Sequence, residues 1–145
     1  TPWDSFALAN LHERTLVGTG QKDAISLHIL YAPSFNAETP TIIGTSHSYR
    51  YVVIYQNNID NLTREKSTLL HEFGHILGLV NNGTPETVSH EFFDKEDRDK
   101  KKVHHCAPHC VMYWAVRDEK ESPDFCGACK ADLIANGGRL LPSAK

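Results

Sequence analysis

The stretch of sequence that decides the fold reads His71-Glu72-Phe73-Gly74-His75-Ile76-Leu77-Gly78. It belongs to a longer segment in which apolar residues recur at helical spacing: Leu69, Phe73, Ile76 and Val80, with Leu70 and Leu77 on an adjacent stripe. This period is typical of an amphipathic helix with one face on a core. The pattern therefore predicts a helix from about Thr63 to Leu79.

Both flanks of this segment carry signals for the ends of a helix. Asn61 or Thr63 can cap the start, because both side chains offer an oxygen to the free backbone N–H groups of a first turn. Gly78, or the run Asn81-Asn82-Gly83 with Pro85 beyond it, can end the helix. We leave both choices open from the sequence.

Short β-rich segments precede the helix. Residues 23–32 alternate apolar and polar positions and stop before Pro33, and residues 41–45 and 51–55 are rich in β-branched and aromatic types. These segments predict a small sheet. After the helix, residues 91–102 include ten charged residues of both signs, which predicts a solvated loop, and residues 130–136 before Gly137-Gly138 predict a short final helix.

Length and composition favour one domain. The chain has 145 residues, of which 40% are hydrophobic, and it contains no repeat and no linker rich in Pro, Gly or Ser. We expect a single catalytic domain over 1–145, with an N-terminal subdomain at about 1–80 and a C-terminal subdomain at about 81–145. A net charge of -3 indicates neither nucleic acid nor an anionic membrane as partner, and no apolar run is long enough to span a bilayer.

The motif His71-Glu72-x-x-His75 predicts a metal site. Two His four residues apart lie on one helical face, so both imidazoles can reach one zinc ion. Glu72, next to the first ligand, can then face a metal-activated water and act as general base. A catalytic zinc normally has three protein ligands and one open position, so a third ligand must come from elsewhere in the chain.

Further motifs follow in order: His105-Cys106-x-x-x-Cys110-x-Met112 and then Cys126-x-x-Cys129. Together with His71-Glu72-x-x-His75-x-x-Gly78, this set resembles the archaemetzincins and related metzincin-type peptidases. The resemblance covers about 59 residues, from His71 to Cys129. It implies a catalytic zinc held by His71, His75 and His105, with Glu72 as base and Met112 in the turn that forms the floor of the site.

The third ligand has two alternatives. Asn81 stands three residues after Gly78, where the family has its His, and an amide oxygen is a poor zinc ligand beside two imidazoles. His105 comes 24 residues after Asn81, so a long insertion must loop out and return. His90 lies within that insertion and is the second alternative. We expect no direct role for the other histidines, which are His12, His28, His47, His104 and His109.

The four cysteines have two interpretations. The resemblance implies a second, structural zinc bound by Cys106, Cys110, Cys126 and Cys129, and the two pairs have knuckle-like spacing. An even number of Cys also suits two disulfides in an exported protein. We favour zinc. Either cross-link would stabilise the segment that follows Met112.

Two further features concern the substrate. Tyr113 follows Met112 directly, whereas related peptidases place a Tyr two residues after the Met, so we expect Tyr113 to pack in the core. Residues 41–49 precede the last strand before the helix, where metzincins keep an edge strand that pairs with extended substrate. We expect a peptide backbone to add there.

We therefore predict an α/β (α+β) metzincin-like zincin: a twisted mixed sheet, an active-site helix and a small C-terminal subdomain with a Met-turn and a final helix. The predicted function is zinc-dependent hydrolysis of peptide bonds in peptides or proteins by a monomer. The alternative is a non-catalytic zinc-stabilised interaction module, against which the presence of Glu72 argues. For the compartment we favour a secreted, periplasmic or surface-anchored protein over a cytoplasmic one. The sequence does not begin with Met, which favours export, whereas a thiolate site favours a reducing cytosol.

Overall fold

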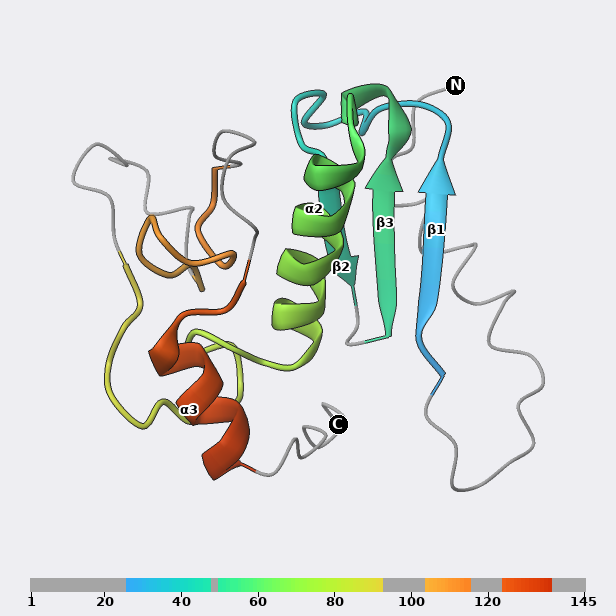
Figure 1. Cartoon of the computed structure of the whole chain (residues 1–145). Helices are drawn as coiled ribbons and strands as arrows, with labels where there is room; N and C mark the ends of the chain where they lie inside the picture. The colour runs from blue at the N-terminus through green and yellow to red at the C-terminus, as the bar shows by residue number, and fades with distance from the viewer. Residues whose placement is uncertain (1–25, 48–49, 93–103, 116–123, 137–145) are drawn as a thin grey trace.

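The computed structural model describes residues 26–47, 50–92, 104–115 and 124–136. These residues form a small α+β structure, with a sheet and a helix in one half and turns with a second helix in the other (Figure 1). The elements are β1 (His28–Ala32), β2 (Gly44–His47), β3 (Tyr51–Tyr55), the 3-10 turn η1 (Gln56–Asn58), α2 (Leu62–Ile76) and α3 (Gly127–Ala135).

The sheet is mixed, with the order β1-β3-β2. The central strand β3 pairs in parallel with β1, Val53 opposite Leu30, and antiparallel with β2, Val53 opposite Thr45. Val52 to Tyr55 are buried, because β3 has a strand on either side and a covered face. β3 coincides with the predicted segment 51–55, and the mixed sheet agrees with the predicted fold class.

The other two strands differ from their predicted bounds. β1 begins at His28, opposite the first residue of β3, so the prediction of a strand at residues 26–27 was wrong; residues 23–25 lie outside the described part of the chain. β2 lies at 44–47 rather than 41–45. The side-chain amide of Asn58 donates to the carbonyls of Pro40, at 2.8 Å, and Ile42, at 2.6 Å, and so holds that stretch in a turn.

Helix α2 packs against β2 and β3 (Figure 1). Asn61 caps it, as one of the two predicted alternatives: its side-chain oxygen accepts from the Arg64 N–H at 2.8 Å. The helix ends at Ile76, three residues earlier than predicted, because Gly78 adopts a φ of 75° and turns the chain away.

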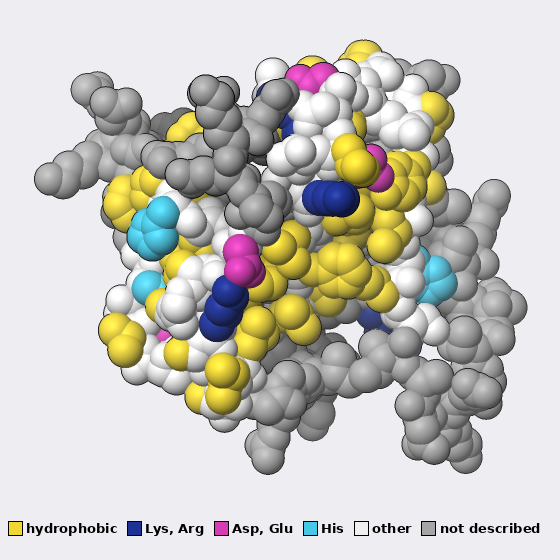
Figure 2. Space-filling view, in the orientation of Figure 1, with side chains coloured by type: hydrophobic (Ala, Val, Ile, Leu, Met, Phe, Trp, Pro, Cys, Tyr) yellow, Lys and Arg dark blue, Asp and Glu magenta, His cyan; other side chains and the backbone are white. Residues whose placement is uncertain are grey.

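The side of α2 that is buried is not its apolar stripe. The buried residues of the helix are Thr68, Glu72 and Gly74, whereas the stripe, Leu69, Leu70, Phe73 and Ile76, is half-buried. Figure 2 shows apolar side chains gathered over the outer face of α2. Gly44 has no side chain, and this lets β2 lie close to α2 at Thr68. A Cβ at position 44 would lie 2.5 Å from Thr68 Cγ2. The side of α2 that faces β2 therefore carries the polar residues Thr68 and Glu72, whereas Gly74 faces Met112.

The C-terminal half has its own core. Leu79, Val80 and Met112 pack there with three buried cysteines, Cys106, Cys110 and Cys129. α3 starts at Gly127 rather than at Lys130, because the Cys126 carbonyl already accepts from the Lys130 N–H at 3.0 Å and closes a first turn. Gly137-Gly138 and most of the charged run 91–102 lie outside the described residues. In the described ranges, no helix is long and apolar enough to cross a bilayer.

Candidate functional site

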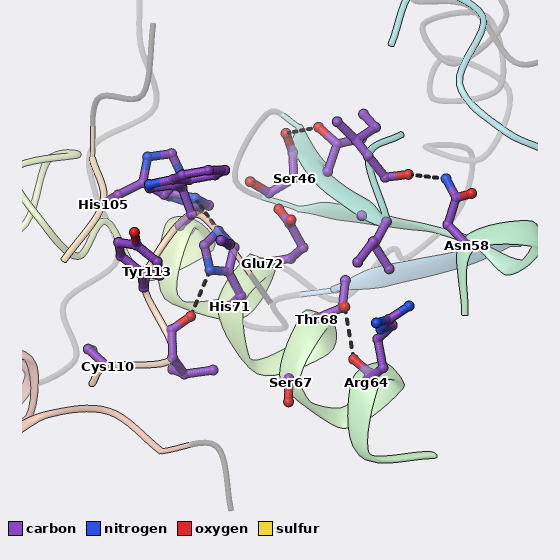
Figure 3. A pocket seen from close by; sticks show the side chains of 18 of the residues that line it. Ser46, Asn58, Arg64, Ser67, Thr68, His71, Glu72, His105, Cys110 and Tyr113 are labelled. Atoms are coloured by element: carbon purple, nitrogen blue, oxygen red, sulfur yellow. Dashed lines mark hydrogen bonds between the residues drawn. The ribbon is translucent and has the colours of Figure 1, made fainter. Parts of the chain in front are cut away.

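Three histidines from separate parts of the chain meet beside α2. His71 and His75 lie one turn apart on the helix, and His105 reaches them from the segment 104–115 (Figure 3). One ring nitrogen of each lies within 4.8 Å of those of the other two. The Nε2 atoms of His71 and His75 are 3.1 Å apart, and the His105 ring centre lies 5.5 Å from that of His71 and 5.4 Å from that of His75.

These distances fit a zinc ion. A tetrahedral zinc with bonds of about 2.0–2.1 Å holds its nitrogen ligands about 3.3 Å apart. His71 Nδ1–H donates to the Val111 carbonyl at 2.8 Å, which leaves the lone pair on Nε2, the atom that faces His75. Burial lowers the pKa of His71 to about 4 and that of His75 to about 3. Both rings are therefore neutral at pH 7, the form that binds metals.

Glu72 lies on the same cleft, next to β2. Its side chain is buried, with 6% exposed, and Ser46 donates hydrogen bonds to it from the hydroxyl and the backbone N–H. Burial is the larger effect and raises the pKa of Glu72 to about 7. A Cβ at Gly44 would lie 3.3 Å from Glu72 Oε1, so this carboxylate is held against the backbone of β2.

Met112 packs against α2 at Gly74. It is fully buried, and a Cβ at Gly74 would lie 2.1 Å from its sulfur. Gly74 is the residue before His75, so the absence of a side chain there lets Met112 reach the backbone of α2. Met112 therefore packs against α2 at the residue before His75, and its place in a Met-turn stays a prediction.

An open cleft of about 1250 Å³ runs past the histidines. Its lining includes Gly44, Thr45 and Ser46 of β2, and Tyr113 and Trp114 of the segment 104–115. Tyr113 lies beside His105 in Figure 3, and its ring centre is 6.3 Å from that of Phe92. Tyr113 is thus half-buried at the cleft rather than enclosed in the core. From the histidines the cleft continues along α2 as far as Arg64.

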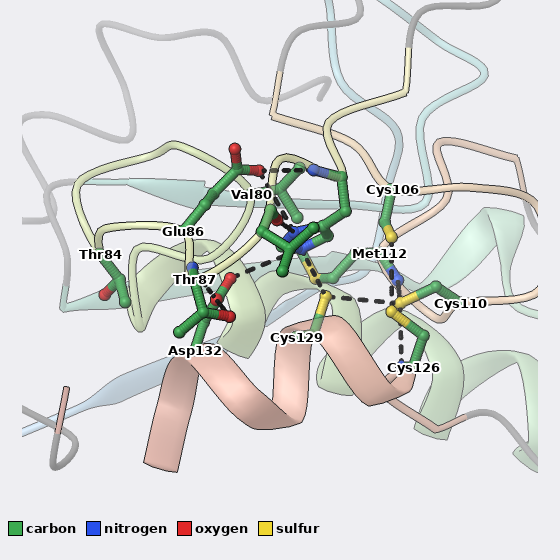
Figure 4. A network of polar contacts seen from close by, with 12 residues as sticks. Val80, Thr84, Glu86, Thr87, Cys106, Cys110, Met112, Cys126, Cys129 and Asp132 are labelled. Carbon is green, nitrogen blue, oxygen red and sulfur yellow. Dashed lines mark hydrogen bonds and ion pairs between the residues drawn. The ribbon is translucent and has the colours of Figure 1, made fainter. Parts of the chain in front are cut away.

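The four cysteines form a second cluster, at the base of α3 (Figure 4). The Sγ atoms of Cys106 and Cys126 are 3.6 Å apart, and those of Cys110 and Cys129 are 3.7 Å apart. A disulfide needs about 2.05 Å, and all four thiols are free. Four thiolates around a zinc with bonds of about 2.3 Å lie about 3.8 Å apart. The cluster is therefore compatible with a bound metal ion, and no disulfide joins these four cysteines in the structure.

The thiols interact as one set. Hydrogen bonds from Cys106 and Cys129 lower the pKa of Cys110. The same contacts raise the pKa of Cys106 and of Cys129, which act as donors. Four thiolates in this small volume would repel one another, so a bound cation would be needed to hold all four ionised.

The two alternative ligands lie elsewhere. His90 Nε2 is 3.3 Å from Cys129 Sγ and 3.6 Å from Asp132 Oδ2, beside the cysteines. Asn81 is exposed and donates to Glu91 Oε2 at 3.3 Å. The structure thus brings His105 to His71 and His75, and it brings neither His90 nor Asn81, because the inserted chain folds toward α3 before it returns.

The remaining histidines surround these clusters or lie apart from them. His104 Nδ1–H donates to the Val80 carbonyl at 3.1 Å, and His109 is exposed on the rim of the cleft. His28 stacks on Tyr51 with ring centres 4.9 Å apart, and His47 is exposed at the end of β2. His12 lies outside the described residues.

Sequence reasoning missed three contributors to the site: Ser46 beside Glu72, the Val111 carbonyl that orients His71, and Gly74 above Met112. Only Gly74 carried a signal, because a glycine in mid-helix is unfavourable unless something approaches its backbone closely. Backbone carbonyls such as that of Val111 have no signature in a sequence.

Comparison with known proteins gives one distant similarity. Over 124 residues the chain is 24% identical to the archaemetzincin of Nanoarchaeum equitans (strain Kin4-M). The aligned region covers 83% of this chain and 59% of the relative, so the chain spans little more than half of that protein's length. No family model and no solved structure matches the chain. The chain is therefore distantly similar to an archaemetzincin over most of its length.

Proposed function

We propose that this chain is a zinc-dependent endopeptidase domain of the metzincin type. One observation carries the proposal: His105 returns from a distant segment to the pair on α2, within 4.8 Å, in a cleft that also holds Glu72. Three imidazoles with one open side form the ligand set of a catalytic zinc rather than of a closed structural one. The similarity to an archaemetzincin supports the same reading.

His71, His75 and His105 are the proposed ligands of the catalytic zinc. When bound, zinc supplies Lewis acidity, which activates a water and polarises the scissile carbonyl. Glu72 takes the proton from the attacking water and passes it to the leaving amine. Ser46 holds the carboxylate in place through its two hydrogen bonds, and the Val111 carbonyl keeps the His71 ring in the orientation that presents Nε2.

The proposed substrate is an extended peptide that pairs with β2. Among the described strands β2 bonds only to β3, and its residues Gly44 to Ser46 line the cleft beside the histidines. A peptide added to this edge would place its backbone along the cleft, with side chains alternating toward α2 and away from it. Cys106, Cys110, Cys126 and Cys129 are the proposed ligands of a second, structural zinc.

The first test replaces Glu72 by Gln, which keeps the shape of the side chain and removes the base. We expect two zinc ions per chain in wild type and variant alike, and a loss of peptide cleavage of at least about 100-fold in the variant. Zinc is measured by elemental mass spectrometry and cleavage with a library of quenched fluorescent peptides. Glu65→Gln is the matched control, since Glu65 lies on the same helix and accepts from the Tyr31 hydroxyl at 2.7 Å, away from the histidines.

Two results would contradict the proposal. Cleavage by a fully zinc-loaded Glu72→Gln protein at the wild-type rate would remove Glu72 from the mechanism. A wild-type chain that holds two zinc ions and cleaves no member of the library would instead be the non-catalytic zinc-stabilised module.

A further inference from the structure

Residues 81–104, called the excursion below, begin and end at neighbouring places; the structure describes residues 81–92 and 104 of this segment. His104 Nδ1–H donates to the Val80 carbonyl at 3.1 Å, so residues 24 apart in the chain are in contact where the excursion begins and ends. Val80 is buried in the same core as Cys106, the residue after His105. His105 therefore lies in space close to the end of the Gly78-Leu79-Val80 turn.

Glu91 holds the two ends of this excursion together. Its Oε1 accepts from the His104 backbone N–H at 2.7 Å, and its Oε2 accepts from the Asn81 side-chain amide at 3.3 Å. Next to it, the Phe92 N–H donates to the His105 carbonyl at 2.8 Å. One acidic side chain and one backbone bond thus connect the start of the excursion to the residue that carries the third imidazole.

The backbone at both ends of the excursion adopts an unfavourable conformation. Val80, Asn81 and His104 have φ values of 56°, 59° and 62°, in the left-handed region that L-residues rarely adopt. Val80 is the least favourable of the three, because its side chain is β-branched. Such conformations persist only where surrounding contacts hold them. The excursion therefore depends on contacts with other parts of the protein.

The cysteine cluster and α3 provide these contacts (Figure 4). Asp132, 1% exposed on α3, accepts from the backbone N–H and the hydroxyl of Thr87 through Oδ1, at 2.6 and 2.8 Å. Its Oδ2 makes no hydrogen bond and lies 3.6 Å from His90 Nε2, which itself is 3.3 Å from Cys129 Sγ. The excursion is therefore attached directly to a proposed metal ligand.

The cysteines also flank the parts of the histidine site that come from this half. His105 precedes Cys106, and the Val111 carbonyl that orients His71 follows Cys110. The Cys106 N–H donates to the Met112 carbonyl at 2.9 Å, which joins these two short segments. A metal ion that draws Cys106 and Cys110 together would fix His105 and Val111 at the same time.

We propose that metal binding by the four cysteines positions His105, so that the thiolate site must fill before the histidine site can bind metal. Asp132 is a positioning residue in this coupling, because it holds the excursion on the cluster through Thr87. The inference rests on the proposed function, since it takes the three histidines as a metal site.

A titration with Co²⁺ tests the order of filling. Thiolate-bound Co²⁺ gives intense sulfur-to-metal charge-transfer bands, whereas a site of three imidazoles gives only weak visible bands, so one spectrum separates the two sites. In the wild-type chain we expect the thiolate bands to saturate before the imidazole bands appear. Imidazole bands that saturate while the thiolate site is still empty would overturn the proposal and leave the peptidase assignment intact.

Two variants test the coupling itself. Cys126→Ser weakens the thiolate site, and Asp132→Ala leaves all seven proposed ligands in place but frees the excursion. We expect each to weaken Co²⁺ binding at the histidines by at least tenfold, and we expect no change in Ile134→Ala, a matched control at an 82% exposed position of α3. Unchanged affinity in both variants would overturn the coupling. Absence of imidazole bands in the wild type would overturn the proposed function as well.

Discussion

The two halves of this molecule hold their functional side chains by different means. In the first half, β1, β3, β2 and α2 form backbone hydrogen bonds along whole elements, and Glu72, His71 and His75 project from a helix that packs on the sheet. In the second half, α3 is the only regular element among the described residues, and four cysteines and Met112 fill the centre. Secondary structure therefore positions His71 and His75, whereas the position of His105 depends on contacts in the core that contains the free cysteines.

Removal of metal should have the largest of the predicted effects. We expect it to increase amide exchange in the C-terminal half and not in the sheet. With chelator we expect amide exchange at 104–115 and 124–136 to increase at least about 100-fold, because structural zinc contributes on the order of 10 kcal/mol to the folding of small thiolate sites. β3 and α2 should keep most of their protection, because their bonds involve no proposed thiolate ligand. Hydrogen-exchange mass spectrometry measures both regions at once.

Readdition of zinc is the control for that experiment and should restore the original exchange. Equal loss of protection in β3 and at 124–136 would show that the halves unfold as one cooperative unit. The two halves would then not differ in what holds them together, and the sheet would depend on metal as much as the cysteine cluster does.

A substitution at the contact between the halves should have an intermediate effect. Gly74→Ala places a Cβ 2.1 Å from Met112 Sδ, in the space where α2 meets the second half. We expect a loss of about 1–3 kcal/mol in the free energy of unfolding, since overpacking of a buried contact costs that much. Chemical denaturation of the zinc-loaded protein measures it.

Gly127→Ala is the matched control, because a Cβ at Gly127 has no neighbour within 4 Å and alanine favours the helix. A double variant with Met112→Ala sharpens the test. If Gly74→Ala lowers the free energy of unfolding equally with and without Met112→Ala, the two residues do not interact. The contact between the halves would then contribute nothing to stability.

The same contrast explains how much the sequence could predict. Helix α2 and β3 follow from periodicity and β-branched runs, because local patterns determine regular elements. The bounds of β2 did not follow, since the side chain of Asn58, far along the chain, holds residues 40–42 in a turn. The position of His105 required a family resemblance, because nothing local indicates that a 24-residue excursion returns through contacts with Glu91 and His104.

The smallest predicted effect lies at the start of α2 and tests whether the first half is self-contained. Asn61 accepts from the Arg64 N–H at 2.8 Å, and its replacement by Ala should cost about 1 kcal/mol in the free energy of unfolding, whereas Asn61→Ser should retain most of the cap. His71 lies beyond the second turn of the helix, so zinc content and the Co²⁺ spectrum should match wild type in both variants. A loss of metal from Asn61→Ala would mean that fraying at the helix start reaches the proposed ligands. The first half would then not be self-contained.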